Sequence, residues 1–554
     1  MRRLVAQLGN RFGALGELFR SPRLRRLQLA WGGFYLGEWA HFVALSVYAY
    51  EKGGVAAVGV LGLVRMVPAA AAVPLGAVLA DRYARELVLV GVHLSRAAAV
   101  GGAAAVLAAG GPTALVFALA ALAATFSAPF RPAQLALLPF FARTPQELVA
   151  ANVSGSTLEG LAVLSGPALA GVLLAVSSPA VVLAVSAAVF LGSALLVLRI
   201  GRSERRPAAG SAKRALAEAL AGFRTLARQP QPRLIIGLFA AQTFVRGLLN
   251  VLLVVTALRV LDIGDSGVGF LNSAFGAGGL AGALAAVSLV GRRRLANPFS
   301  LGLVFWGAPI ALVGAWPAGA WALVCLALVG AGNAVLDVSG YTLIQRSVDD
   351  SVLGRVFGVF EILVMASIGL GSILAPVLVA ELGPRGALAV TGALLPALAL
   401  VFRSGLKAID AAAEVPEREL ALLSSVPLFT PLPITTLERL ASRLRPVRVP
   451  AGTEVVRQGD PGDLFYVIAA GEADVIHDGA RVATLGLGQY FGEIALLRDV
   501  PRVATVVART DLDVYALERD VFVSAVSGHA QSAAAAEDVM GARLAGLRVP
   551  TAPL

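Results

Sequence analysis

Residues 488–505 combine the residue types that bind a phosphate group next to a sugar. The segment reads Gly-Gln-Tyr-Phe-Gly-Glu, continues as an apolar turn over 494–497, and reaches Arg502 nine residues after Glu493. Free backbone N–H groups at a helix start bind anions, and a guanidinium offers paired donors to a phosphate. A carboxylate beside a phosphate repels it unless that carboxylate accepts hydrogen bonds from another group, such as a sugar hydroxyl. The set therefore indicates a site for a small, ring-shaped sugar phosphate.

A second group of candidate residues consists of ionisable side chains in strongly apolar stretches. Each such charge is costly at membrane depth and normally faces a cavity or a partner. Glu38, His41, Arg65 and Arg246 lie near the middle of their stretches, and Glu38 and His41 share one helical face. Two titratable groups there could carry a coupling proton, and the two arginines would suit an anionic group. We therefore expect these four residues to act in transport and proton coupling.

Further charges lie toward the basic ends of the apolar stretches, namely Arg96, Arg131, Glu159, Asp337 and Glu361. The arginines and acids of the apolar stretches are similar in number, which favours ion pairs that hold helices together or close a gate. We assign this gating role to Arg131, Glu159, Asp337 and Glu361.

The composition places much of the chain in lipid. Of 554 residues 57% are hydrophobic and 15% are charged, and the mean hydropathy is +0.78. Soluble chains are about half apolar and about one quarter charged. The single cysteine, Cys325, excludes an internal disulfide and a thiolate metal cluster, and four scattered histidines give no zinc pattern. We expect no metal site.

The charge distribution divides the chain in two. Residues 1–407 hold 33 Lys+Arg and 16 Asp+Glu, a net charge of +17, whereas residues 408–554 hold 13 and 19, a net charge of −6. A basic, apolar part is thus followed by an acidic part of ordinary composition. This pattern predicts a membrane domain joined to a soluble domain, and it argues against nucleic acid as a partner.

Twelve stretches of the first part have the length and apolarity of a membrane-spanning helix, which needs about 20 residues. They lie at 27–50, 54–80, 86–109, 113–141, 150–176, 179–199, 233–261, 266–290, 297–315, 318–345, 352–380 and 385–402. If both chain ends are cytoplasmic, the inner loops carry nearly all of the arginines, and the outer loops hold little beyond Lys52, Arg259 and Arg385. This bias predicts cytoplasmic N- and C-termini.

The segments outside these stretches complete the predicted organisation. Residues 1–26 are basic with apolar residues near one helical face, which indicates an interfacial helix on the cytoplasmic surface or a basic tail. The longest inner loop, 200–232, contains an amphipathic helix from about residue 212. It separates two six-helix halves, 27–199 and 233–403, a recurring plan of transporters. The predicted fold is an all-α membrane domain of twelve helices in two repeats.

Two motifs of this part resemble those of a known family. The segment from Gly76 to Arg85 reads Gly-Ala-Val-Leu-Ala-Asp-Arg-Tyr-Ala-Arg and is similar to the signature loop of the major facilitator superfamily. Asp81, Arg82 and Arg85 match that loop, and alanine (Ala77 and Ala84) stands at its two glycine positions. The segment 166–171, Gly-Pro-Ala-Leu-Ala-Gly, resembles an element of that superfamily's antiporters. The resemblance to the superfamily covers about residues 20–405, and the first, fourth and fifth apolar stretches are most similar to its bacterial exporter branch. The resemblance implies a secondary transporter in which Asp81 and Arg82 act in gating.

The second part begins with a polar linker, 404–420. Short helices are expected at 417–424 and 434–444, and from residue 447 the pattern has period two with regular turns, which indicates a small antiparallel barrel or jelly roll. Residues 521–547 return to helical composition. We expect an α+β domain over 421–545, followed by a tail, 546–554.

This domain is similar to cyclic nucleotide-binding domains over about residues 420–540, and segment 488–506 resembles their phosphate-binding cassette. The resemblance implies that Glu493 accepts the ribose 2′-hydroxyl, that Arg502 holds the cyclic phosphate, and that Gly492 permits close approach. It also implies that Asp474 orients Arg502. The remaining contacts implied are backbone N–H groups of Ile494 or Ala495 and of Val503, with Thr505 near the base or the phosphate.

The residue after the arginine bears on the choice of ligand. In this family cGMP-selective members tend to carry Thr or Ser there, but Val503 has no hydroxyl, so we expect cAMP. Alternatives are that the domain binds another nucleotide or none. An aromatic cap over the base is not evident, and Val539 and Met540 are the candidates in the last helix.

Together these features predict a twelve-helix transporter, with proton-coupled efflux of a small molecule, whose cytoplasmic C-terminal domain senses cAMP. No Walker loop is present, and we expect neither an enzyme nor a cofactor beyond the regulatory nucleotide. The alternatives are a non-transporting membrane receptor or anchor for the sensor, and an exporter of the cyclic nucleotide itself. An alanine-rich, arginine-over-lysine composition favours a bacterial inner membrane, and both a monomer and a homodimer are open.

Overall fold

A computed structural model of the chain describes residues 22–141, 145–200, 222–224, 226–289, 294–348, 350–412, 417–432 and 434–546. The chain divides into two compact units, Met1–Asp410 and Ala411–Leu554, called the first and the second unit below. Most of the expected interfacial segment 1–26, much of loop 200–232 and the tail lie outside the described residues.

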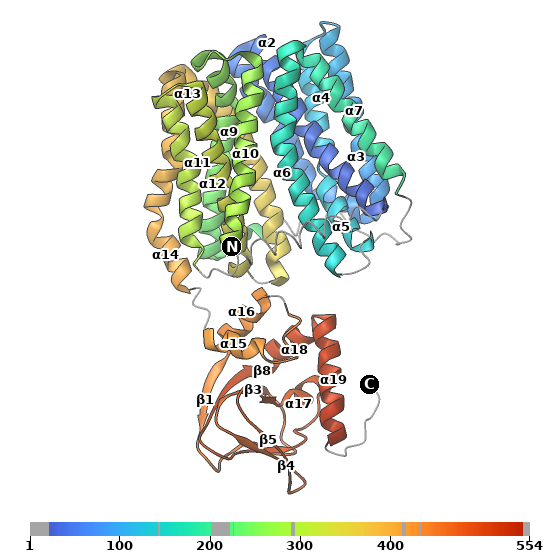
Figure 1. The fold of residues 1–554 in the computed structure, drawn as a ribbon, viewed down its shortest axis with the longest axis vertical. Helices are drawn as coiled ribbons and strands as arrows, with labels where there is room; N and C mark the ends of the chain where they lie inside the picture. The colour runs from blue at the N-terminus through green and yellow to red at the C-terminus, as the bar shows by residue number, and fades with distance from the viewer. Residues whose placement is uncertain are drawn as a thin grey trace. The chain divides into compact units, whose positions relative to one another are not determined.

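The first unit is a bundle of long helices in two groups that lie side by side (Figure 1). The first group, blue to cyan in Figure 1, comprises α2 (Pro22–Arg82), α3 (Arg85–Ala108), α4 (Thr113–Phe126), α5 (Phe130–Phe141), α6 (Pro145–Val176) and α7 (Pro179–Leu198). The second group comprises α9 (Pro230–Val255) with a π-helical extension, Thr256–Val260, then α10 (Gly264–Ala286), α11 (Ala296–Ala315), α12 (Gly319–Ser347) and α13 (Asp350–Val401). Most of each predicted apolar stretch lies within these helices.

Two of the helices contain a break that divides them. Helix α2 has non-helical backbone at Gly53 and Gly54, and α13 has it at Gly383, where φ is 68°. Arg65 and Glu38, both in α2 but on opposite sides of the break, are joined by a hydrogen bond of 2.9 Å. The two segments of α2 therefore fold back against each other. Among the described residues, ten helices are long and apolar enough to cross a membrane, with α2 and α13 each taken as one.

The predicted stretch 113–141 is interrupted in the structure. It consists of α4 and α5, separated by a turn over residues 127–129. A Cβ atom on Gly76 would lie 2.7 Å from the carbonyl carbon of Ala128 in this turn. The glycine therefore lets the second segment of α2 approach the turn, a tertiary contact that apolar periodicity does not reveal.

Helices α10 and α12 approach each other through glycines. A Cβ atom on Gly278 would lie 1.8 Å from the carbonyl oxygen of Ala327, and one on Gly330 would lie 1.9 Å from that of Phe275. Neither position has room for a side chain without a backbone shift. Small residues in membrane helices permit such close backbone contact.

The second unit is a two-sheet antiparallel barrel with helices, as the period-two pattern predicted. Its strands are β1 (Arg445–Val449), β2 (Glu454–Val456), β3 (Leu464–Ala470), β4 (Ala473–His477), β5 (Ala480–Leu485), β6 (Tyr490–Phe491), β7 (Thr505–Ala508) and β8 (Leu512–Glu518). One sheet has the order β1-β8-β3-β6 and the other β2-β7-β4-β5. Apolar residues of both sheets, such as Ile468, Val506 and Val514, form the core between them.

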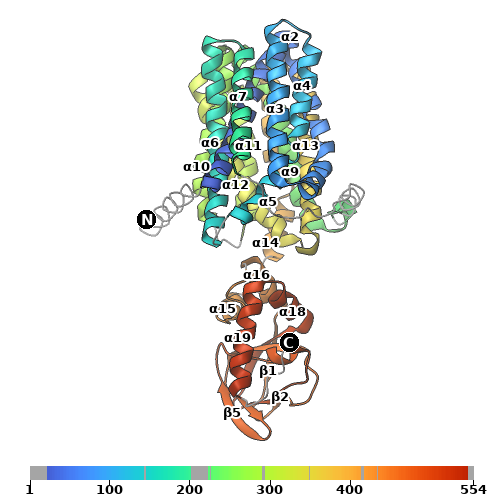
Figure 2. The same cartoon turned by 90° about the vertical axis from the view of Figure 1, so that its right-hand side faces the viewer.

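Helices pack outside this barrel. They are α15 (Glu417–Ser424), α16 (Ile434–Arg443), α17 (Glu493–Arg498), α18 (Arg519–Ser527) and α19 (Ala530–Gly546). Phe465 of β3 and Phe522 of α18 stack with ring centroids 4.4 Å apart, and Phe429 meets both rings edge-on. Helix α19 runs along one side of the barrel (Figure 2).

The segment predicted as a linker begins with a helix. Helix α14 (Arg403–Ala412) buries Leu406 and Ile409 in the apolar core of the first unit. The Asp410 carboxylate accepts a hydrogen bond of 3.0 Å from the backbone N–H of Ala296. Residues 403–410 are therefore part of the first unit.

Replacing Gly330 by Ala should lower the free energy of unfolding by about 1–3 kcal/mol, the usual cost of overpacking. The added methyl group would meet the backbone of α10. Thermal unfolding of the purified protein in detergent measures the change. Gly319→Ala, in the same helix but with open space around its Cβ position, is the control. Equal unfolding temperatures of the two variants would contradict the close contact.

Candidate functional site

A cavity of about 260 Å³ lies in the second unit, beside the segment predicted to bind a sugar phosphate. One part of its wall is apolar and comes from β2, β4, β5 and β7, with Val456, Val475 and Val506 among the lining side chains. The other part is polar and includes Glu493 and Arg502. The cavity therefore joins an apolar compartment to a carboxylate and a guanidinium.

Gly492 sets the geometry of the polar end. It precedes α17 with φ of 94°, a left-handed conformation that glycine adopts without strain. A Cβ atom there would lie 2.6 Å from Nη1 of Arg502. The close approach that the structure shows at Gly492 is that of the Arg502 guanidinium.

Arg502 is held almost fully buried, with 4% of its side chain exposed. Its Nη1 donates to the carbonyl oxygen of Gly492 at 3.1 Å and its Nη2 to that of Leu464 at 2.8 Å. The Asp463 carboxylate lies 3.6 Å from Nη2. Burial lowers the pKa of the guanidinium, and Tyr466 and Asp463 oppose this shift. The charge is therefore oriented by the protein before any ligand arrives.

Asp474 does not contribute to this orientation. Its carboxylate accepts a hydrogen bond of 2.6 Å from Thr484 and lies 3.7 Å from Arg481. Side chains alternate along a strand, and the neighbouring Val475 lines the cavity, so Asp474 faces the opposite side of β4. This corrects the prediction that Asp474 orients Arg502, a role that belongs to Asp463 and two carbonyl groups.

Thr505 is displaced from the cavity for the same reason. Ala504 and Val506 line the cavity, and the Thr505 hydroxyl instead accepts a hydrogen bond of 2.9 Å from the backbone N–H of Gln458. Thr505 therefore fixes the loop after β2. This corrects the prediction of a contact with base or phosphate.

Glu493 is 1% exposed and has one occupied and one unoccupied oxygen. Its Oε1 accepts a hydrogen bond of 2.8 Å from Nη1 of Arg543 in α19. Its Oε2 is buried and has no hydrogen-bond partner among the described residues. Burial raises the pKa of this carboxyl, and Arg543 opposes the shift. The second oxygen is thus free to accept a hydrogen bond.

Sequence reasoning missed Arg543. Its guanidinium lines the cavity and lies 4.4 Å from the centre of the Tyr490 ring. A signal was present, because Arg543 is the single basic residue of segment 530–546. Of the two candidate caps on α19, Met540 packs against Ile494, whereas Val539 packs against the hydrophobic core that contains Phe465 and Phe522.

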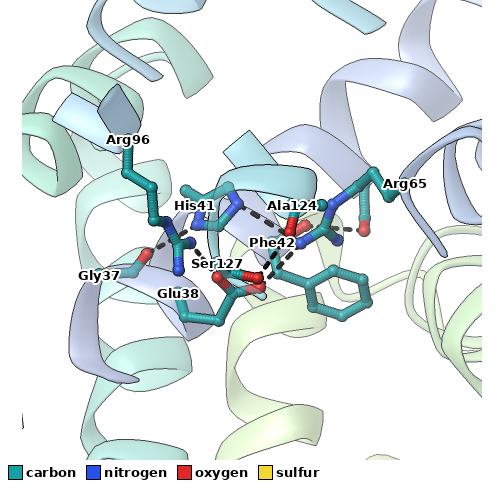
Figure 3. Close-up of polar contacts among 9 residues, drawn as sticks. Gly37, Glu38, His41, Phe42, Arg65, Arg96, Ala124 and Ser127 are labelled. Carbon is teal, nitrogen blue, oxygen red and sulfur yellow. Dashed lines mark hydrogen bonds and ion pairs between the residues drawn. The ribbon is translucent and has the colours of Figure 1, made fainter. Parts of the chain in front are cut away.

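In the first unit, Glu38 lies between two arginines (Figure 3). Arg65 Nη2 donates to Glu38 Oε1 at 2.9 Å, and Arg96 of α3 donates to Oε2. His41 donates from Nδ1 to the carbonyl oxygen of Gly37 at 2.9 Å and accepts at Nε2 from Arg65 at 3.4 Å. The four side chains form one cluster that joins α3 to both segments of α2.

Aromatic rings enclose the two arginines of this cluster. The Arg96 guanidinium lies 4.4 Å from the ring centres of both Phe34 and Phe190, and that of Arg65 lies 5.2 Å from Phe42. Arg96 and Arg65 are 0% and 2% exposed. Glu38 and Arg65, both predicted to act in transport and proton coupling, are thus held with Arg96 in one ion-paired cluster.

The other predicted residues of the first unit come from both helix groups. Arg131 is attracted electrostatically to Glu159 and, across the groups, to Glu361. Tyr35 and Glu159 lie close enough to interact, and Arg246 is attracted electrostatically to Asp337. Of the two residues predicted to act in gating, Arg82 ends α2 with an exposed side chain, and the Asp81 side chain lies outside the described part of the chain.

Two families match the chain. The Major Facilitator Superfamily matches residues 29–245 and 234–450, and the cyclic nucleotide-binding domain family matches residues 446–529. The protein therefore belongs to the Major Facilitator Superfamily and carries a C-terminal cyclic nucleotide-binding domain, as the two resemblances predicted. With its many long apolar helices it is an integral membrane protein.

Curated relatives resemble only part of the chain. A cAMP-dependent protein kinase regulatory subunit of Aspergillus niger is 43% identical over 104 residues, 18% of this chain and 25% of the relative. A cGMP-dependent protein kinase of Eimeria tenella is 35% identical over 137 residues, 24% of this chain and 14% of the relative. The chain thus spans a quarter or less of their length.

Among solved structures, the regulatory domain of Toxoplasma gondii PKA with cAMP is 29% identical to this chain. The match covers 26% of this chain and 55% of that one, with a TM-score of 0.22.

Replacing Glu38 by Gln should lower the free energy of unfolding by about 3–5 kcal/mol, because two buried guanidiniums would lose their counter-charge. Thermal unfolding in detergent tests this. Glu51→Gln, at an exposed position of the same helix, is the control and should have little effect. Equal unfolding temperatures for the two variants would show that the cluster does not stabilise the fold.

Proposed function

We propose that this protein is a secondary active transporter of a small molecule, regulated by cAMP that binds to its C-terminal domain. The observation that carries the proposal is the pairing, in one cavity, of an oriented arginine with a buried carboxylate that has a vacant acceptor oxygen. A cyclic phosphate and a ribose hydroxyl are the two groups that such a pair would bind.

The cavity suits the parts of cAMP in turn. Arg502 would hold the cyclic phosphate, assisted by the backbone N–H groups of α17 and Val503. Glu493 Oε2 would accept the 2′-hydroxyl, since Oε1 is taken by Arg543. The valines of β2, β4 and β7 would cover the purine. Val503 offers no hydroxyl to a guanine, which favours cAMP over cGMP.

Arg543 offers a route from ligand to protein conformation. It joins α19 to the same carboxylate that would receive the ribose hydroxyl. A ligand donor at Oε2 would share the charge of Glu493 with Arg543 and so change the strength of that ion pair. The position of α19 would therefore depend on cAMP, which is a physical basis for regulation.

Membership in the Major Facilitator Superfamily supports transport by the first unit. If the two segments of α2 and of α13 each cross the bilayer, twelve spans result, in two groups of six. The excess of arginine in the alternate loops favours cytoplasmic N- and C-termini, so the sensor would meet cytoplasmic cAMP. We place the protein in a bacterial inner membrane and propose proton-coupled efflux. Asp81 and Arg82 would act in gating with Arg131, Glu159 and Glu361.

Replacing Arg502 by Ala should nearly abolish cAMP binding. Loss of one partner of a buried charge pair costs about 2–5 kcal/mol, which is a Kd at least roughly 25-fold weaker. Isothermal titration calorimetry of the full-length protein in detergent measures it. Asp474→Asn is the matched control, because Asp474 faces away from the cavity, and it should bind as the wild type does. An unchanged Kd for Arg502→Ala would show that Arg502 does not hold the cyclic phosphate.

The same variant tests regulation. Hydrogen–deuterium exchange of the first unit should change on addition of cAMP in the wild type and stay constant in Arg502→Ala, because a regulatory ligand must bind one conformation better. If exchange of the first unit is unaffected in a wild type that binds cAMP, the domain does not regulate transport.

Replacing Val503 by Thr should raise the affinity for cGMP relative to cAMP by roughly 2- to 13-fold, the equivalent of one hydrogen bond of about 0.5–1.5 kcal/mol. Competition binding with both nucleotides measures the ratio. Val503→Ala, which removes the side-chain branch without adding a hydroxyl, should leave the ratio unchanged. An equal change of the affinity ratio in both variants would show that the shape of the side chain, and not the added hydroxyl, causes the effect.

A further inference from the structure

The two helix groups of the first unit each hold a carboxylate deep in an apolar helix, and the two carboxylates differ in their surroundings. Both oxygens of Glu38 are bound by arginines that are themselves buried. A proton on Glu38 would leave two guanidiniums without a counter-charge, an arrangement that is strongly destabilising. Glu38 is therefore suited to a constant charge and unsuited to a cycle of protonation.

Asp337 of α12 has only a neutral donor. Its Oδ2 accepts a hydrogen bond of 2.8 Å from the side-chain amide of Asn333, one helical turn earlier. Its side chain is only partly buried. Within the part of the chain that the structure describes, no Lys, Arg or His nitrogen lies within 4 Å of its carboxylate. Asp337 can therefore gain and lose a proton without breaking an ion pair.

A hydrogen-bond network holds Asp337 in place. The Asn333 oxygen accepts from Trp306 Nε1 of α11 at 3.0 Å and from Gln242 Nε2 of α9 at 3.4 Å. These two donors fix the amide so that its N–H₂ group faces the carboxylate. Trp306 is fully buried. Three helices thus orient one carboxylate, as a proton-binding group requires.

Arg246 of α9 supplies the counter-charge at longer range. It is attracted to Asp337, and its guanidinium lies 5.8 Å from the ring centres of both Trp39 in α2 and Phe275 in α10. Cation–π contacts hold a guanidinium without neutralising it. Arg246 therefore touches both helix groups and keeps its charge available to an anionic partner.

The remaining groups that act electrostatically on Asp337 are Glu159 of α6, Arg131 of α5 and Tyr341 of α12. An ionised Asp337 would be paired electrostatically with Arg246. Once Asp337 takes a proton from water on one side of the membrane, Arg246 would be released toward Glu159 or an anionic group of a substrate. When the proton returns to water on the other side, Arg246 would turn back to Asp337.

We propose that Asp337 is the carboxylate that binds and releases the coupling proton, with Arg246 as its mobile counter-charge and Asn333, Trp306 and Gln242 as positioning residues. This assignment replaces Glu38 in that role and gives Asp337 more than a gating function. It rests on the proposed proton-coupled transport.

Infrared difference spectroscopy of the purified full-length protein, recorded as a function of pH in lipid nanodiscs, tests the assignment. Subtracting the spectrum of Asp337→Asn from that of the wild type at each pH removes the carboxyl groups that both proteins share, Glu493 among them. The difference should contain a carbonyl band of a protonated carboxyl group that appears and disappears with pH, and Glu38→Gln should keep this band. Asn333→Leu should keep the band and shift its midpoint, because it removes the oriented donor and leaves the carboxyl group.

Glu361→Gln gives a second control if Glu38→Gln does not fold, and it too should keep the band. The assignment would be overturned if the wild type and Asp337→Asn gave the same carbonyl bands at every pH, or if the band that depends on Asp337 disappeared in Glu38→Gln or Glu361→Gln. The measurement needs neither substrate nor cAMP. A failed cAMP titration would therefore leave Asp337 in its role, and a failed infrared result would leave the nucleotide site intact.

Discussion

A charge removed from water must be met by an opposite charge or by hydrogen bonds, and both units of this protein are organised by that requirement. In the first unit, Glu38 joins Arg65 and Arg96, and the ion pairs connect α3 with both segments of α2. In the second unit, Glu493 joins Arg543, and the ion pair connects α17 with α19. Each pairing determines which helices pack together around a buried site.

Such pairings form only where backbones can approach closely. Gly330 and Gly278 let α10 and α12 come into backbone contact, and Gly492 lets the Arg502 guanidinium lie against the chain that precedes α17. In lipid, apolar surface gives little drive for helices to associate, so close packing must supply it. The glycines thus stabilise the arrangement in which the charged groups meet.

The buried carboxylates differ in how many of their oxygens have an ion-pair or hydrogen-bond partner. On this difference we distinguish a structural role from the proposed functional roles. Glu38 has a cation on each oxygen and belongs to the framework. Glu493 has one oxygen without a donor, and Asp337 has one neutral donor and a distant cation. Native proteins rarely leave buried polar atoms unpaired. The two incompletely satisfied carboxylates are therefore the ones that we propose for ligand binding and for proton exchange.

The sequence by itself determined the membrane part and the cyclic nucleotide-binding part, the apolar stretches, the barrel, and the pair Glu493 and Arg502. These follow from patterns over a few neighbouring residues, because hydropathy, strand period and the short cassette are local properties. Only the tertiary structure decided that Arg96 pairs with Glu38 across 58 residues and Arg543 with Glu493 across 50. It also turned Asp474 and Thr505 away from the cavity, because the face of a strand that meets a site depends on its register with other strands. Buried charges choose partners by distance in space, and sequence separation carries no information about that distance.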